Sequence, residues 1–482
     1  MQAEKSAQKG GAHTLDDVKR IFETQRANRW NVAKTTAADR IAKLVRIREA
    51  LLAQREDLQS AIYQDYKKNP GEVDLTEVFP TISDINHTVK HLPRWMKPHK
   101  VGTPLVLFGT HSEVRYEAKG IVLILGPWNY PFQLLMIPLV TAIAAGNCAM
   151  VKASSKVPHT ARFIRKFLSG LFQENEVAVI EGGHDTADAL LELPFDHIFF
   201  TGSPSIGKKV MGCAAKHLTS VTLELGGKSP VIVDATANIE QTAERVMWGK
   251  FINAGQTCVA PDYLLVHQSR ESALIEECKK VIQQRFGRTA EAREKSPDFC
   301  RLVSHGHFDA LKRVLDSAVA DGARVEIGGE ARHEDRYLAP TLLSGVTPTS
   351  PIMREEIFGP ILPILSFSSL EEAIEVVRAR EKPLALYIFS QDENNVENIL
   401  RNTTAGGTCV NSLIVHLANT NLPFGGVGNS GMGNYHGFFG FRSLSHERAV
   451  LRQGFPDSLK FFYPPYTPRV KKMIELAMRY IG

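Results

Sequence analysis

Cys258 stands in a local sequence that suits covalent catalysis. It lies in FINAGQTCVAPDY, where small and polar neighbours predict an exposed turn after a helix. An exposed thiol in a turn can act as a nucleophile if its surroundings favour the thiolate. A lone cysteine is more often a small core residue. Cys258 by itself therefore leaves both interpretations open.

Two further polar residues supply what a thiol nucleophile needs. Glu224 lies in VTLELGGKSP, a carboxylate inside an apolar strand. Apolar surroundings raise the pKa of a carboxyl group, which suits a general base, although many such residues simply face solvent. Asn129, in GPWNYP, follows a buried strand, and its amide can donate to a developing oxyanion. The set predicts a nucleophile, a base and an oxyanion donor.

Two glycine motifs come close to phosphate-binding patterns. GSPSIGKK (202–209) departs from the P-loop at Lys209, which replaces the hydroxyl ligand of magnesium, so nucleotide hydrolysis is not expected. The apolar run before it and a helix from about Ser205 still predict free N–H groups for a pyrophosphate, or an ordinary strand-to-helix turn. GVGNSG (426–431) lacks a preceding strand and is predicted to be a loop.

Composition excludes several classes of protein. The 482 residues predict two or three domains, and the net charge of +5 forms no basic and aromatic stripe, so nucleic-acid binding is not expected. The six cysteines lie far apart without a C-x-x-C pair, and the N-terminal sequence is polar, which together predict a cytoplasmic protein. None of the 16 histidines has a metal-ligand spacing, so no metal is expected.

The predicted elements alternate as in a doubly wound α/β fold. Residues 121–151 carry no charge, but Gly-Pro, Asn129 and Pro131 divide them into strand, loop, helix and strand rather than a membrane span. Helices are predicted over 14–68, and a hairpin in LVLFGTHSEVRYEAKG (105–120). Further helices are predicted near 157–172, 205–216, 236–252, 271–285, 304–320 and 370–380, and strands at EVAVIEG, DHIFFTGS, SPVIVDA, YLLVHQ, ILPILSF and LALYIFS.

Six motifs in order resemble those of the aldehyde dehydrogenase superfamily: GPWNYPF, FTGSPSIG, LELGGKSP, GQTC, EEIFGP and PFGGVGNSGMG. The likeness covers about residues 14 to 450, and GPWNYPF and LKFFYPPYTP resemble the class 3 branch of fatty and aromatic aldehyde enzymes. It implies that Cys258 attacks the aldehyde, that Asn129 and the Cys258 backbone N–H stabilise the oxyanion, and that Glu224 activates the water that hydrolyses the thioester.

The resemblance also implies a nicotinamide cofactor, NAD or NADP. The adenosine half would be held by Lys152, Ser154, Ser155, Gly202, Ser203 and Gly207. Glu356 would bind the nicotinamide ribose, Phe358 would pack beside the nicotinamide, and Trp128 would line the cofactor cleft. The family usually reads Pro-Ser-Glu after the lysine, whereas this chain has Ser155 followed by Lys156. Without the acid a 2′-phosphate is not repelled, so we expect NADP to be accepted.

The family fold implies a Rossmann-like cofactor domain (1–95 and 117–224), an α/β catalytic domain (225–420) and a small β bridging element (96–116 and 421–450) that makes a homodimer, followed by a tail (451–482). The active site should lie in a tunnel between the two large domains. An apolar aldehyde is expected as substrate, with Trp128, Tyr130, Phe132, Phe461 and Phe462 as candidate tunnel residues. The alternatives are a CoA-acylating enzyme, a cysteine hydrolase and a non-catalytic binding protein on the same fold.

Overall fold

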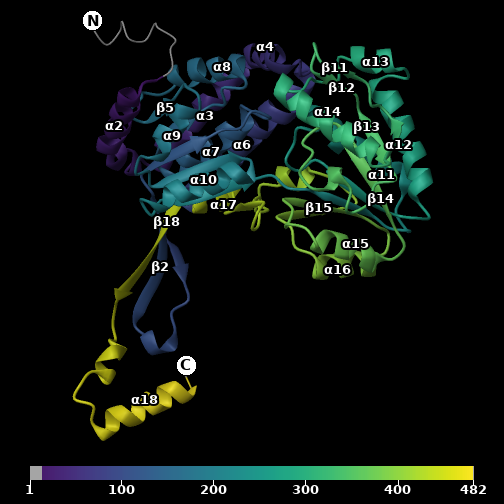
Figure 1. Cartoon of the computed structure of the whole chain (residues 1–482). Coiled ribbons are helices and arrows are strands. Elements are labelled where there is room, and N and C mark those ends of the chain that lie inside the picture. The colour runs from purple at the N-terminus through teal and green to yellow at the C-terminus, as the bar shows by residue number, and fades with distance from the viewer. Residues whose placement is uncertain (1–12, 481–482) are drawn as a thin grey trace, which may run out of the picture.

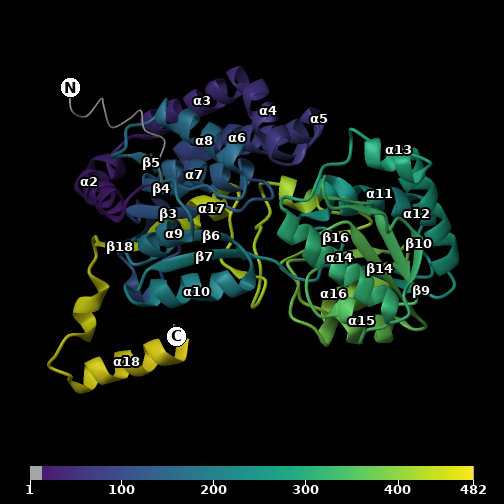
Figure 2. The ribbon, with the colours of Figure 1, turned by 45° about the horizontal axis from the view of Figure 1, so that its top comes forward.

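The computed structural model describes residues 13–480 as two α/β lobes and a projecting arm (Figure 1). Figure 2 shows the lobes side by side, with chain from the C-terminal part passing between them. Most of the N-terminal segment whose polarity argued against a secretion signal lies outside the described residues, as do the last two residues of the predicted terminal helix.

A six-stranded sheet forms the centre of the first lobe, in the order β17-β7-β6-β3-β4-β5. All neighbours are parallel except β17 and β7. The strands are β3 (Ile121–Leu125), β4 (Cys148–Lys152), β5 (Val177–Val179), β6 (His197–Gly202), β7 (Ser220–Leu225) and β17 (Gly431–Met432). The order reverses between β3 and β6, and ligands bind open α/β sheets at the carboxyl ends of strands flanking such a point. The Asn129 loop and the Gly202 turn both follow these strands.

Helices cover both faces of this sheet, which explains why every residue of β3 and β4 is buried and why all but Lys152 at the end of β4 are apolar. The helical elements are α2 (Leu15–Ala33), α3 (Ala37–Ala53), α4 (Arg55–Tyr66), α5 (Pro70–Val73), η1 (Asp74–Val78), α6 (Phe79–Trp95), α7 (Gln133–Ala145), α8 (Pro158–Ser169), α9 (His184–Leu191), α10 (Pro204–Ala215) and α17 (Gly437–Ser443). Thr14 and Thr36 cap α2 and α3, each in a capping box with the aspartate three residues on. The stretch 121–151 is strand, loop, helix and strand, as predicted.

The second lobe is built on a seven-stranded sheet in the order β10-β13-β14-β9-β8-β15-β16, parallel except for β10. Its strands are β8 (Pro230–Val233), β9 (Tyr263–His267), β10 (Arg324–Ile327), β13 (Thr341–Ser344), β14 (Ile361–Phe367), β15 (Ala385–Phe389) and β16 (Gly407–Val410), beside a β11 (Ala331–Arg332) and β12 (Tyr337–Leu338) pair. Its helical elements are α11 (Ile239–Phe251), η3 (Ile252–Gly255), α12 (Glu271–Phe286), α13 (Ala290–Lys295), α14 (His305–Ala320), η4 (Pro351–Met353), α15 (Leu370–Arg378), α16 (Glu393–Asn402) and η5 (Val415–Ala418). The predicted α/β alternation is confirmed.

The arm is a three-stranded antiparallel sheet of β1 (His99–Val101), β2 (Thr110–Ala118) and β18 (Ser445–Gln453). A hairpin forms between β1 and β2, but only β2 lies within the predicted range 105–120, because the first strand, β1, comes before it. Residues 105–107, expected within a strand, make the short helical turn η2 (Leu105–Leu107) instead, because Pro104 restricts the backbone before it and Gly109 turns at φ 92° after it. Beyond β18, η6 (Ser458–Phe462) and α18 (Pro468–Tyr480) lie at the far end of the arm (Figure 1).

The chain predicted as the second part of the bridging element, 421–450, contributes β17 and α17 to the first lobe and most of β18 to the arm. The domain boundaries themselves stay a prediction. Within residues 13–480, no helix has both the length and the apolar character needed to cross a membrane.

Candidate active site

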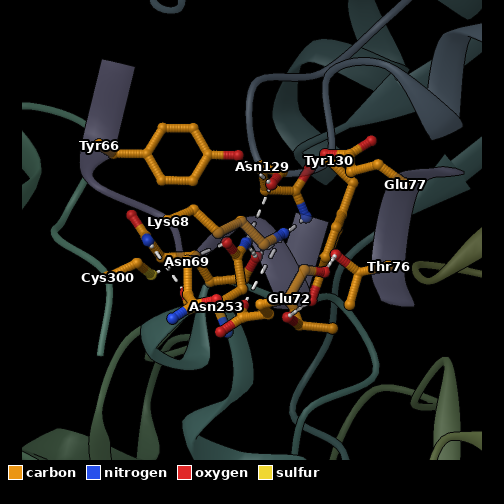
Figure 3. A network of polar contacts seen from close by, with 12 residues as sticks. Tyr66, Lys68, Asn69, Glu72, Thr76, Glu77, Asn129, Tyr130, Asn253 and Cys300 are labelled. Carbon is orange, nitrogen blue, oxygen red and sulfur yellow. Dashed lines mark hydrogen bonds and ion pairs between the residues drawn. The ribbon is translucent and has the colours of Figure 1, made fainter. Parts of the chain in front are cut away.

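The loop between β3 and α7 presents Asn129. The side chain is 5% exposed, and its Nδ2 donates to the carbonyl oxygen of Gln256 at 3.1 Å. The Asn129 backbone carbonyl accepts from the Tyr66 hydroxyl at 3.1 Å and from the Nδ2 of Asn253 at 2.9 Å (Figure 3). An amide NH2 carries two hydrogens, so one remains for a ligand. These contacts join Asn129 to the turn that leads into Cys258.

The turn before Cys258 has a left-handed backbone over three residues. Asn253 and Ala254 have φ values of 55° and 52°, and Gly255 has 74°. Such a conformation costs a residue other than glycine about 1–3 kcal/mol. A Cβ on Gly255 would lie only 2.3 Å from the carbonyl oxygen of Gly359, so this position needs glycine. The exposed turn predicted from the sequence is instead a strained and largely buried one.

The Cys258 thiol lies at the wall of an apolar cavity. The residue is part-buried, and burial raises the pKa of its thiol to about 12, with further contributions from the Glu356 and Glu224 carboxylates. The backbone N–H groups of Cys258 and Val259 act in the opposite direction. The three residues that the sequence nominated on separate grounds, together with Glu356, are thus brought to one place.

Glu224 lies near the end of β7 with 3% of its surface exposed. Neither carboxylate oxygen has a hydrogen-bond partner among the described residues, and burial raises the pKa well above its ordinary value. Gly431 of β17 pairs opposite it. The side chain is thus a buried acid-base group that is free of structural hydrogen bonds, as the apolar strand around it predicted.

The Glu356 side chain packs against the backbone of Gly226 and Gly227. A Cβ on Gly226 would be 2.0 Å from Glu356 Oε2, and the Gly227 N–H lowers a pKa that burial raises to about 8. The loop carrying Glu356 is anchored by Asp262, which accepts from the Ile357 N–H at 2.8 Å.

An ion pair beneath that loop was not foreseen from the sequence. Lys228 pairs with Asp262 and also donates to the carbonyl oxygens of Ile352 and Glu355, at 3.1 and 2.7 Å. Lys228 directly follows Gly226 and Gly227. The segment 226–228 therefore both packs against the Glu356 side chain and holds the loop that carries it by hydrogen bonds.

Trp128 and Phe358 pack together, with ring centroids 5.3 Å apart. His307 completes the cluster, 5.4 Å from Trp128, and its Nε2 bonds the Phe358 carbonyl oxygen at 2.9 Å. Phe358 has φ 51°. Lys156 lies over the Trp128 ring at 5.7 Å. The structure therefore joins the two aromatic residues that were predicted to line one cleft.

A second cavity, of about 310 Å³, opens beside Ser155. Arg162 and Arg165 of α8 line it, with Glu181 paired to Arg165 at 3.3 Å. The sequence suggested Lys156 as the positive charge here, but that side chain lies over Trp128, and the two arginines line the cavity instead. In the sequence, the position of Arg162 and Arg165 on an amphipathic helix that begins shortly after Ser155 could have indicated that they lie near it.

The other predicted cofactor residues lie at or just after the carboxyl ends of β4 and β6 and on α10. Lys152 ends β4 with 7% exposure, and burial lowers its pKa; Ser154 Oγ accepts from the Lys156 N–H at 3.3 Å. Gly202 ends β6 and Ser203 is the residue before α10, so strand, turn and helix follow one another as predicted. Gly207 lies on α10 where a Cβ would meet the Leu225 side chain at 2.6 Å.

The cavity at Cys258 measures about 220 Å³ and is lined mainly by apolar side chains. Of the predicted tunnel residues, Tyr130 lines it. Phe132 does not: it is fully buried and packs against Phe163 and Phe167 in the core. Phe461 and Phe462 lie in η6 on the arm. Leu75, Phe79, Leu134, Ile137, Trp248, Val415 and Phe424 supply apolar wall instead.

A buried charged network behind Asn129 was missed by sequence reasoning (Figure 3). The Lys68 ammonium is fully buried, 3.8 Å from Glu72 and 4.3 Å from the Tyr130 ring centroid. Glu77 accepts from the N–H groups of Phe132 and Gln133 at 3.2 and 2.7 Å, and burial raises its pKa to about 7.

The same network continues to the turn that leads into Cys258. Glu72 accepts from the Asn253 N–H at 2.7 Å, and the Tyr130 and Thr257 hydroxyls are 2.6 Å apart. It therefore supports both the Asn129 loop and the residue before Cys258. Within residues 13–480, no group of three His, Cys, Asp or Glu side chains is arranged to hold a metal ion.

Comparison with known proteins identifies the family. The model of the aldehyde dehydrogenase family matches residues 3–450. The chain belongs to the aldehyde dehydrogenase family. This aldehyde dehydrogenase is therefore an oxidoreductase that acts on aldehydes.

Relatives cover nearly the whole enzyme. It is 44% identical to the 4,4′-diaponeurosporen-aldehyde dehydrogenase of Staphylococcus aureus, over 94% of this chain and 96% of the relative. It is 40% identical to a probable coniferyl aldehyde dehydrogenase of Caulobacter vibrioides, over 94% and 95%. A solved structure of Staphylococcus aureus AldH in a substrate-bound state superposes with a TM-score of 0.91 at 43% identity, over 95% of this chain and 99% of that one.

Proposed function

We propose that this enzyme oxidises an apolar aldehyde to its carboxylic acid with Cys258 as nucleophile, Asn129 as oxyanion donor and Glu224 as base. One observation carries the proposal: Cys258 lies on the wall of an apolar cavity, close enough to the buried Glu224 carboxylate to feel its charge, and that carboxylate has no hydrogen-bond partner among residues 13–480.

The first steps take place at the thiol. At neutral pH a thiol with a pKa of about 12 is protonated, so attack requires loss of its proton to water, and Glu224 is not needed until the thioester has formed. The sulfur adds to the aldehyde carbon, and the oxyanion of the thiohemiacetal accepts hydrogen bonds from Asn129 Nδ2 and the Cys258 N–H. Bound NAD(P)+ supplies the acceptor for the hydride that leaves this carbon.

The remaining thioester is resolved by water. Glu224 takes a proton as water adds to the thioester carbon, and the acid leaves as the C–S bond breaks and the thiol is restored. A carboxyl group with a raised pKa suits this task because it holds a proton readily.

The residues present fit a nicotinamide cofactor. The cavity beside Ser155 would take the adenosine half, and the Gly202–Ser203 turn at the start of α10 would face the pyrophosphate. Lys152 and Ser154 would contact the same half, and Gly207 lets α10 approach the sheet. On the other side, Glu356 would bind the nicotinamide ribose, and Phe358 and Trp128 would line the cleft for the ring.

We propose that both NAD and NADP serve, since the family uses one or the other. Arg162 lines the cavity beside Ser155, and within the described residues it has no carboxylate at ion-pair distance. A guanidinium there favours a 2′-phosphate. Kinetics with the two cofactors at equal concentration test this, and a strict requirement for NAD contradicts it.

An apolar aldehyde, aromatic or of medium to long chain, is the proposed substrate class. The cavity walls support it, and so do relatives named for coniferyl and diaponeurosporen aldehydes. A cytoplasmic homodimer is also proposed. Its support is the set of six cysteines, all free, and the exposed arm, which offers β edges to a second copy.

Pre-steady-state kinetics of Glu224→Gln test the mechanism. We expect a burst of about one NADH per enzyme, followed by a steady rate lower by about 10²–10⁴-fold, because only hydrolysis of the thioester needs the base once attack has occurred. Thr222→Val, a buried change on the same strand, is the matched control and should turn over normally.

Two outcomes contradict the assignment of Glu224. Wild-type steady turnover of the variant would show that water needs no such base, and loss of the burst would place Glu224 before hydride transfer. Release of acid without added CoA separates the enzyme from a CoA-acylating one.

A further inference from the structure

The apolar cavity at Cys258 has one charged exception in its wall, Asp84 of α6. The residue is 1% exposed, and neither carboxylate oxygen has a hydrogen-bond partner among residues 13–480. Burying a carboxylate without partners is costly, so a retained one requires an explanation. Asp84 shares its helix face with Thr76, Phe79, Pro80 and Ser83, which all line the cavity. Asp84 therefore lies in the wall of the cavity, with its carboxylate buried there.

His436 lies beside Asp84 in a strained conformation. Its Nδ1 is 3.8 Å from Asp84 Oδ1, and its φ of 75° with ψ of 137° is a combination that only glycine adopts readily. The imidazole stacks on Tyr435 with centroids 4.2 Å apart. The next residue, Gly437, has to be a glycine, because a Cβ there would lie 2.2 Å from the Thr420 carbonyl oxygen. The backbone thus holds the ring at the cavity wall at an energetic cost.

We propose that Asp84, with His436, forms a subsite that binds a hydroxyl group at the far end of the aldehyde substrate. The inference rests on the proposed function. Asp84 offers acceptor oxygens and a hydroxyl is a donor, so such a ligand would supply the hydrogen bond that the carboxylate lacks among residues 13–480. An ammonium group fits less well, because it would have to leave water for a mainly apolar cavity that already holds an imidazole.

The position of Asp84 sets the reach of such a substrate. Thr76 lies in η1 near Tyr130 (Figure 3), and Asp84 lies about two helical turns further along in α6, on the order of 10 Å away. Tyr435 lines the same cavity, and burial raises the pKa of its phenol, with further contributions from Glu224, Cys258 and Asp84. The hydroxyl is therefore separated from the aldehyde by a ring or a chain, as in a para-hydroxylated aromatic aldehyde.

A matched pair of substrates tests the subsite. 4-Hydroxycinnamaldehyde and 4-methoxycinnamaldehyde differ in the donor, and we expect kcat/KM to favour the hydroxyl compound by at least about tenfold. In Asp84→Leu the ratio should fall to about one, and in Asp84→Asn, which keeps an acceptor oxygen, to an intermediate value. Thr81→Val, a buried change on the same helix outside the cavity wall, should keep the wild-type ratio.

Equilibrium binding separates the subsite from the chemistry. Trp248 lines the cavity, so quenching of tryptophan fluorescence can report binding of the two corresponding alcohols to the enzyme without cofactor. We expect the wild type to bind the hydroxyl alcohol more tightly than the methoxy alcohol and Asp84→Leu to bind the two equally. If this binding preference is seen but no aldehyde is oxidised, the proposed function is refuted and the subsite is not. A wild-type ratio near one, a ratio unchanged in Asp84→Leu, or a stronger Asp84-dependent preference for 4-(aminomethyl)benzaldehyde overturns the hydroxyl subsite.

Discussion

Replacing Lys68 with methionine removes a buried ammonium group from behind the loop that carries Asn129. At 3.8 Å from Glu72 Oε1 its attraction is about 4 kcal/mol at an effective dielectric constant of about 20. The contact with the Tyr130 ring adds up to about 2 kcal/mol, and relief from desolvating the ammonium offsets part of the total. We expect a net loss of about 3 kcal/mol in the free energy of unfolding at about pH 8, within the range for breaking a buried pair.

The loss should depend on pH in a definite direction. Burial raises the pKa of Glu72 and of Glu77, the latter to about 7, so the folded state binds these protons more tightly than the unfolded state. Such groups lower stability as pH rises through the folded pKa. Without Lys68 both pKa values rise further. The variant should therefore lose less stability at about pH 6, where the carboxyl groups can be neutral, than at about pH 8.

Thermal unfolding at the two pH values measures this effect. A loss of about 3 kcal/mol corresponds to about 6–12 °C for a lobe of this size. The matched control is Lys67→Met, which removes the neighbouring lysine, whose side chain is exposed. It should lower the free energy of unfolding by about 1 kcal/mol or less. An equal shift at both pH values, or a shift no larger than that of Lys67→Met, would refute the argument that Lys68 compensates buried carboxylates.

Further predictions concern the cofactor, the thiol and the strained turn. Ser155→Glu should raise KM for NADP by about tenfold or more and change KM for NAD less, because a carboxylate repels a 2′-phosphate; equal changes in steady-state kinetics would contradict this. With a thiol pKa of about 12, alkylation of Cys258 by iodoacetamide without cofactor should accelerate about tenfold per pH unit between about pH 7 and 9, and a plateau in that range would show an already ionised thiol. Gly255→Ala should lower the free energy of unfolding by more than about 2 kcal/mol and remove most of the activity, since its Cβ would overlap Gly359. Gly212→Ala, the control with open space around its Cβ, should leave the unfolding midpoint unchanged or raise it.

Local sequence predicted the central part of the site because hydrophobic runs and polar interruptions are short-range features. The uncharged stretch 121–151 folds as strand, loop, helix and strand, and the polar residue that breaks it, Asn129, lies next to the turn of Cys258. Glu224 stands out because a carboxylate is rare inside an apolar strand.

The rest depends on tertiary burial that no local pattern encodes. Lys68 and Glu72 follow a helix end with Pro70 and Gly71 and have the composition of an exposed turn, yet the second lobe covers them. Phe132 and Tyr130 are both aromatic, and only the direction of the loop sends the first to the core and the second to the cavity.

The close packing of Gly226 against Glu356 has a consequence for sequence divergence. The carboxylate occupies the volume that any side chain at position 226 would need, with the nearest oxygen 2.0 Å from the site of a Cβ. A substitution at 226 therefore requires either that the Glu356 carboxylate moves from its place beside the Gly227 N–H or that position 356 holds a shorter side chain. Substitutions at positions 226 and 356, which lie on different segments of the chain, are therefore coupled. We expect the two positions to co-vary across homologues or to stay unchanged together.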